Sequence, residues 1–167
     1  MIMSRIYVVI CIGMLFFSCS KSNTSTAGVS FFPQVPVNIT ILLTDPTYNQ
    51  LTIQPGNWIY LYNVGYKGII IYHTINDTYL AYDRTCPINP LDTCAYVSMD
   101  SSGIFLNCSK THIFRQQTSI CNGSNAGYCG STFFPDTGFP RSGSANIPLK
   151  QYTVKLDATG NYLYITS

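Results

Sequence analysis

Cys129-Gly-Ser-Thr-Phe-Phe134, with Gly143-Ser-Ala-Asn-Ile-Pro-Leu-Lys-Gln-Tyr152 downstream of it, is the most informative stretch of this 167-residue chain. A second stretch, Tyr82-Asp-Arg-Thr-Cys-Pro-Ile88, precedes it in the sequence. In both, a cysteine stands beside glycine or proline, the residues that interrupt regular structure and form turns. The two stretches therefore predict two cysteine-bearing loops.

The rest of the chain favours β-strands over helices. Alanine is scarce, glutamate is absent, and 13 tyrosines accompany many isoleucines and threonines, a composition that suits strands. Runs of such residues alternate with turn-forming ones, which predicts a single all-β domain, a small antiparallel sandwich or barrel. Residues 69–72 form an apolar run typical of a strand buried on both faces, and 75–78 predict a hairpin turn. The expected strands are 37–43, 58–62, 68–74, 79–82, 95–99, 103–107, 151–156 and 161–166.

The first residues have the composition of a targeting signal. Arg5 precedes a mostly apolar run that is shorter than the ~20 residues needed to span a bilayer. Phe16-Phe-Ser-Cys19 resembles a loose bacterial lipobox, whose cysteine becomes the lipidated N-terminus. We therefore expect a signal peptide over 1–18, lipidated Cys19 with a polar tether over 19–33, and the β domain over 34–167. The alternative is an ordinary secretory leader with a chance cysteine.

Lipidation of Cys19 would attach the protein to membrane lipid, because several buried acyl chains hold firmly where one does not. The loose lipobox is similar to those of lipoproteins from the Bacteroidetes group. We expect a protein anchored to a membrane of such a bacterium, in the periplasm or at the cell surface.

The motifs around the two cysteine-bearing loops resemble those of Rieske iron–sulfur domains. In that family the second loop reads Cys-Pro-x-His-Gly-Ser-x-Phe and is followed by Gly-Pro-Ala-x-x-x-Leu-x-x-Tyr. Gly130-Ser-Thr-Phe133 and the segment from Gly143 to Tyr152 match most of this pattern. The first loop would present Cys-x-His where Cys86-Pro-Ile88 stands. The resemblance, which is strongest to Rieske-like lipoproteins of Bacteroidetes, implies a base of strands with the two loops at one tip.

Several cluster ligands that the resemblance requires are absent. Ile88 stands at the histidine position of the first loop, Cys129 at that of the second, and Ala126 at the second cysteine position. Only Cys86 matches its ligand position. A Rieske centre needs two thiolates and two imidazoles, so the resemblance implies a domain that has lost its cluster, with no cofactor expected. An unusual [2Fe–2S] cluster is the alternative.

Five cysteines remain for an oxidising compartment once Cys11 and Cys19 are set aside. An odd number leaves at least one free thiol, and connectivity cannot be read from the sequence. Because the resemblance brings the two loops together, it implies a Cys86–Cys129 disulfide before any other. The five are Cys86, Cys94, Cys108, Cys121 and Cys129.

A metal site has weaker support. Cys108, His112 and Cys121 could join Cys129 as zinc ligands, but their spacing matches no common zinc motif, and disulfides are the commoner fate of such thiols. The other histidine, His73, falls inside an expected strand. No metal is therefore expected.

Other functions are disfavoured by charge and motif content. With 10% charged residues and a net charge of +2, the chain has no basic field for nucleic acid. No hydrolase or metalloprotease motif is present and acid–base groups are few, so an enzyme is not expected, at most an electron-transfer component. A salt bridge or a turn cap accounts for Asp83 and Arg84. An exposed aromatic cluster at the loop tip is a hypothetical protein or glycan contact, formed by Tyr128, Phe133, Phe134 and Phe139.

The sequence thus predicts a lipid-anchored, extracytoplasmic domain with a binding or structural role in an envelope assembly, beside a protein partner that the sequence does not identify. The alternative is an electron-transfer protein that uses an unusual iron–sulfur cluster or a redox-active Cys86/Cys129 pair.

Overall fold

The computed structural model describes residues 32–92, 94–109, 111–114, 117–120 and 129–167. The expected signal peptide and Cys19 lie outside these ranges, as do Cys121, Ala126 and Tyr128, so their roles stay predictions. Within the described ranges, no helix combines the length and apolarity needed to cross a bilayer.

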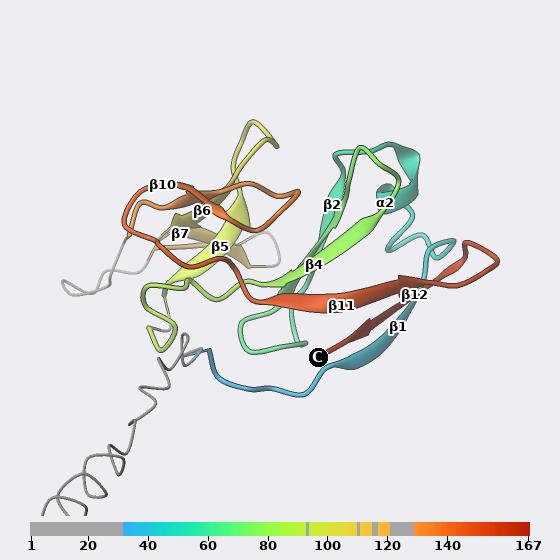
Figure 1. The fold of residues 1–167 in the computed structure, drawn as a ribbon, viewed down its shortest axis with the longest axis horizontal. Coiled ribbons are helices and arrows are strands. Elements are labelled where there is room, and N and C mark those ends of the chain that lie inside the picture. The colour runs from blue at the N-terminus through green and yellow to red at the C-terminus, as the bar shows by residue number, and fades with distance from the viewer. Residues whose placement is uncertain (1–31, 93, 110, 115–116, 121–128) are drawn as a thin grey trace, which may run out of the picture.

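The larger of the two main sheets forms a base (Figure 1). In the described part of the chain it has six strands in the order β1-β12-β11-β4-β3-β2, and every neighbouring pair is antiparallel. A single-turn helix, α2 (Gln50–Ile53), precedes β2 and buries Leu51. The strands are β1 Asn38–Leu42, β2 Trp58–Leu61, β3 Ile69–His73, β4 Tyr79–Asp83, β11 Gln151–Leu156 and β12 Tyr162–Thr166.

The smaller sheet lies beside the base and forms a tip subdomain (Figure 1). Its described strands run in the order β10-β9-β6-β5 and are again antiparallel. A separate hairpin joins β7 to β8. The strands are β5 Tyr96–Met99, β6 Leu106–Ser109, β7 Thr111–Phe114, β8 Gln117–Ile120, β9 Thr132–Phe133 and β10 Pro140–Ser142.

The tip is an excursion from the base between two paired strands. The chain leaves through β4 and returns through β11, and these strands pair with Gln151 opposite Tyr82 and Tyr152 opposite Ala81. Both cysteine-bearing loops fall inside the excursion. The predicted all-β, antiparallel fold with these loops at one tip is therefore confirmed.

Strand β3 contributes to both hydrophobic cores. Side chains alternate across a strand, so Ile69 and Ile71 pack in the base core while Ile70 and Tyr72 pack in the tip core. The three isoleucines are 0% exposed, which confirms the prediction of a strand buried on both faces. The tip core also contains Tyr82, Cys86, Val97, Leu106, Cys108, Phe133 and Leu149.

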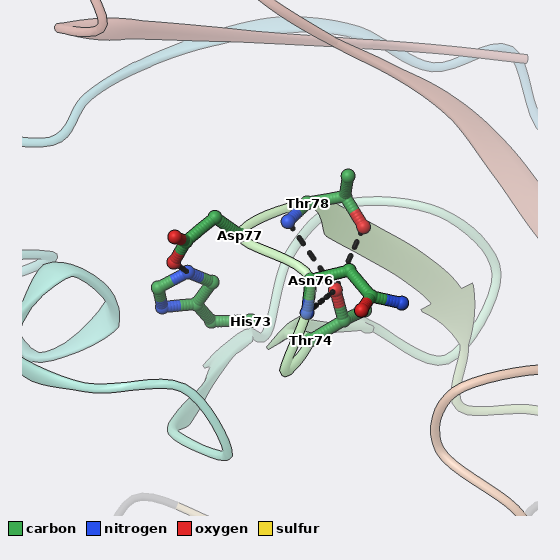
Figure 2. A network of polar contacts seen from close by, with 5 residues as sticks. All are labelled: His73, Thr74, Asn76, Asp77 and Thr78. Carbon is green, nitrogen blue, oxygen red and sulfur yellow. Dashed lines mark hydrogen bonds and ion pairs between the residues drawn. The ribbon is translucent and has the colours of Figure 1, made fainter.

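Hydrogen bonds between its own backbone and side chains build the predicted turn between β3 and β4 (Figure 2). Thr74 Oγ1 accepts hydrogen bonds from the N–H groups of Asn76 and Thr78 at 3.3 and 3.2 Å. Asp77, at φ 55°, places its carboxylate 3.2 Å from Nε2 of His73. The turn is confirmed, and His73 belongs to it.

Strands also form in a region that lies outside the expected strands. Residues 108–130 carry many Gly, Ser and Asn residues, yet β6 extends through Ser109, and β7 and β8 occupy Thr111–Phe114 and Gln117–Ile120. Antiparallel pairing with neighbouring strands outweighs the weak strand propensity of this composition. The longer β6 matters for the cysteines because it contains Cys108.

Two isoleucines test the shared core. We expect Ile71→Ala, at 0% exposure, to lower the free energy of unfolding by about 2–5 kcal/mol, because it removes packing and leaves a cavity. Ile75→Ala, at 73% exposure in the adjoining turn, should change it by less than about 0.5 kcal/mol. Urea denaturation of both variants makes the comparison, and equal effects would contradict this account of β3.

Candidate functional site

Three cysteines from three segments of the tip bring their sulfur atoms together. The Sγ atoms of Cys86, Cys108 and Cys129 all lie within 4.8 Å of one another. Cys86 and Cys108 form a disulfide with a Cα–Cα distance of 5.7 Å, well inside the usual range. Cys129 is a free, partly buried thiol whose Sγ lies 3.2 Å from Sγ of Cys86. Cys94 is disulfide-bonded too, but its sulfur is not among the three that converge.

The disulfide differs from the expected Cys86–Cys129 pairing. The two loops do meet, as predicted, but Cys86 is bonded to Cys108. Strand β6 explains the difference, because its Cys108 pairs with Val97 in the ladder and is 1% exposed beside the equally buried Cys86. One signal in the sequence could have found it: Leu106 and Cys108 stand two apart, as core-facing residues of a strand do.

The loop that carries Cys86 is positioned by the buried carboxylate of Asp83. Its Oδ1 accepts hydrogen bonds from the N–H and Oγ1–H of Thr85 and, at 3.4 Å, from the N–H of Lys67. Its Oδ2 accepts from the N–H of Tyr66 at 2.8 Å and from the hydroxyl of Tyr152 at 2.7 Å. Asp83 therefore acts as the turn cap that the sequence suggested, and it also joins β11 to this turn.

Arg84 is buried among tyrosine rings. Its side chain is 1% exposed, and its Cζ lies 4.3 Å from the ring centre of Tyr60 and 5.6 Å from those of Tyr62 and Tyr96. Its Nε donates to the Val97 carbonyl at 3.0 Å, whereas Nη1 has no hydrogen-bond partner among the described atoms. Burial lowers the pKa of Arg84, but a guanidinium stays charged in proteins. The rings stabilise this cation.

Lys67 is a second buried cation beside the first loop. Its Nζ donates to the carbonyls of Asp92 and Ala95 and lies 5.5 Å from the ring centre of Tyr96. Burial lowers the pKa of Lys67 to about 8, although the charges of Asp92 and Asp83 oppose this shift. Lys67 thus fixes the backbone between Cys86 and β5 through hydrogen bonds, but its charge has to be buried to do so.

The second loop is fixed to its neighbours through Ser131, which is 0% exposed. The Ser131 hydroxyl accepts from the Ala145 N–H at 2.8 Å and reaches the Cys129 carbonyl at 3.5 Å. The Ser131 carbonyl accepts a hydrogen bond from the Cys108 N–H at 2.9 Å. Gly143 packs directly against it, since a β-carbon there would lie 2.4 Å from Ser131 Cα. Ser131 therefore sets Cys129 and Cys108 side by side.

Other predicted positions do not join the cysteines. Ile88, at the histidine position of the first loop, is 36% exposed. His73 lies at the other end of the β3–β4 ladder, opposite Tyr79, and its ring stacks on Tyr79 at 4.6 Å. His112 lies on β7.

The hypothetical aromatic contact surface is only partly as expected. Phe133 is 0% exposed and packs in the tip core, so it cannot belong to a contact surface. It points inward because it pairs with Leu106 of β6. Phe134 and Phe139 are exposed, and Phe134 meets Phe105 edge-on at 6.0 Å.

The donor set does not fit a Rieske cluster. Such a cluster needs two imidazoles on one iron, whereas the groups that converge here are three sulfurs, two of them joined in a disulfide. The remaining thiol and the disulfide support cysteine chemistry at this site.

Solved structures with a similar course of the backbone include ferredoxins. One chain of the complex of reduced oxygenase and oxidised ferredoxin in carbazole 1,9a-dioxygenase has a TM-score of 0.43 and 19% identity, and the match covers 80% of this chain and 94% of that one. The ferredoxin of carbazole 1,9a-dioxygenase from Nocardioides aromaticivorans IC177 has a TM-score of 0.41 and 15% identity, and that match covers 80% of this chain and 98% of the ferredoxin. No protein-family model and no curated protein matches the sequence.

Two glycines with the same backbone conformation test the packing of the second loop. Gly143 and Gly56 have φ of +92° and +91°, but a β-carbon at Gly56 meets nothing within 4 Å. Alanine should cost about 1–2 kcal/mol at either position because of its φ, and roughly 1–3 kcal/mol more at Gly143 because of the clash with Ser131. Denaturant unfolding of Gly143→Ala and Gly56→Ala measures the difference. Equal losses would show that Gly143 does not hold the loop by close approach.

The lowered pKa of Lys67 predicts that the free energy of unfolding depends on pH. The folded protein releases the Lys67 proton near pH 8 and the unfolded chain near 10.5, so the unfolded state binds more protons between these values. The free energy of unfolding should therefore rise with pH in this window, by less than about 1.4 kcal/mol per pH unit. Above pH 10 the effect is opposed, because burial raises the pKa of Tyr60, Tyr82 and Tyr152.

Urea unfolding between pH 7 and 9.5 makes this measurement. Lys67→Met should lose the upward slope, whereas Lys155→Met, which changes an exposed lysine on β11, should keep it. An unchanged slope in Lys67→Met would contradict the assignment.

Proposed function

We propose that this chain is a Rieske-like domain in which cysteine chemistry, in place of an iron–sulfur cluster, holds the two ligand loops together. It is anchored to a membrane outside the cytoplasm through lipidated Cys19, and its role is one of binding or structure within the envelope. The observation that carries the proposal is the convergence of the two loops on sulfur, with Cys86 Sγ 3.2 Å from Cys129 Sγ and bonded to Cys108.

The chemistry of the site supports the loss of the cluster. A disulfide between Cys86 and Cys108 removes both thiolates from metal binding, because a metal ligand must be a thiolate. The histidine positions of the two loops hold Ile88 and Cys129. A crosslink of this kind stabilises a domain by roughly 2–4 kcal/mol, which gives the tip a rigidity that a cluster would otherwise provide.

An electron-transfer role is the second candidate function. It is favoured by one observation, the free thiol of Cys129 in contact with the disulfide. Electrons would then be carried by thiols and disulfides, two at a time.

Analysis of the full-length chain, purified from membranes in detergent without air, tests the proposal. We expect a colourless protein without stoichiometric iron or sulfide, a Cys86–Cys108 crosslinked peptide in non-reducing digests, and an acylated N-terminal peptide beginning at Cys19. Iron and labile sulfide near two per chain, with a visible absorption band, would overturn the loss of the cluster. An unmodified Cys19 in a soluble protein would overturn the anchor.

A further inference from the structure

The three cysteines of the cluster differ in how far each residue is buried. Cys86 and Cys108 are 0% and 1% exposed, so their disulfide is shielded from external thiols. Cys129 is only partly buried. Its thiol is also the only one of the three that can donate in the 3.2 Å contact with Cys86, since Cys86 is disulfide-bonded. The thiol of the least buried of the three cysteines therefore touches a disulfide between the two most buried ones.

We infer that Cys129 exchanges with the Cys86–Cys108 disulfide, so that the tip is a thiol–disulfide relay between a fully buried bond and a bond at the edge of the core. This inference rests on the proposed function, because it requires that the three cysteines hold no iron. It adds an activity to that function: acceptance of two electrons from an external dithiol.

The internal step needs no reagent from outside. The Cys129 thiolate attacks Sγ of Cys86, the Cys129–Cys86 bond forms, and the Cys86–Cys108 bond breaks with its electron pair on Cys108. The proton lost by Cys129 is balanced by one taken up by Cys108. One disulfide and one thiol are present before and after, so nothing is oxidised or reduced overall.

The external step transfers two electrons. A dithiol attacks Sγ of Cys129 in the rearranged bond, and Cys86 leaves as a thiolate that takes up a proton. The second thiol of the reagent then attacks the mixed disulfide and releases Cys129 as a thiol. The dithiol is oxidised to its disulfide and the protein gains two thiols. Cys129 is the sulfur attacked because its residue is the least buried of the three.

Reduction kinetics test the relay in the full-length, iron-free protein. Samples incubated with excess dithiothreitol are acid-quenched, alkylated and mapped by mass spectrometry. We expect Cys129→Ser to slow the opening of the Cys86–Cys108 bond roughly tenfold or more, because the reagent loses its route through Cys129. The Cys94 disulfide is an internal control whose rate should not change.

The sign of the effect separates a relay from a structural role. If Cys129 served only packing, Cys129→Ser would loosen the tip and open the bond at the same rate or faster, which would overturn the inference. Cys108→Ser provides the complementary variant. After oxidation with glutathione disulfide, we expect it to contain a Cys86–Cys129 bond, and persistence of both thiols in the folded variant would contradict the relay.

The wild-type chain supplies a measurement that does not depend on how well a variant folds. Acid quenching during partial reduction should trap a Cys86–Cys129 crosslinked peptide beside the Cys86–Cys108 one. Its absence at every time point would overturn the relay while leaving the proposed function intact. Iron in the purified protein would instead overturn the proposed function.

Discussion

The carboxylate of Asp83 fixes the point where the tip leaves the base. It is 0% exposed and accepts hydrogen bonds from the turn before β3, from the first loop and from β11. A buried carboxylate is costly unless such donors surround it. The segments that bring them must therefore stay in place together. Because Cys86 follows Asp83 by three residues, the position of the cysteine cluster depends on this carboxylate.

The tyrosine content of the chain has a second use beyond packing. Two cations, Lys67 and Arg84, are buried near Asp83, and both lie against the ring of Tyr96. Aromatic faces stabilise a cation without placing another charge in the interior. The hydroxyl of Tyr60 also accepts a hydrogen bond from the Met99 N–H at 2.9 Å, which joins β2 of the base to β5 of the tip. The ring of Tyr60 also lies against Arg84, so Tyr60 serves both charge stabilisation and contact between the sheets.

The sequence predicts the local features of this fold better than its long-range contacts. The hairpins β3–β4 and β11–β12 are recognisable because each joins two β-rich runs through a turn of a few residues. The central position of β3 is also predictable, because the short β-branched run Ile69-Ile-Ile-Tyr72 suits a strand buried on both faces. The role of Asp83 cannot be predicted from the sequence, because its hydrogen-bond donors Tyr66 and Tyr152 are far apart in the chain. The disulfide partner of Cys86 likewise depends on contacts between residues that are distant in the sequence.

Loop length does not decide which of two disulfides Cys86 forms, with Cys108 or with Cys129. The Cys86–Cys108 bond joins residues 22 apart, and a Cys86–Cys129 bond would join residues 43 apart. Doubling a closed loop changes its closure free energy by only about 0.6 kcal/mol. The two bonds therefore constrain the unfolded chain almost equally, and the balance between them rests on the packing of Cys108 and Cys129. Since β6 buries Cys108 whereas Cys129 lies at the edge of the core, side-chain burial favours the bond to Cys108. The looser packing of Cys129 leaves its thiol free to react with the neighbouring bond.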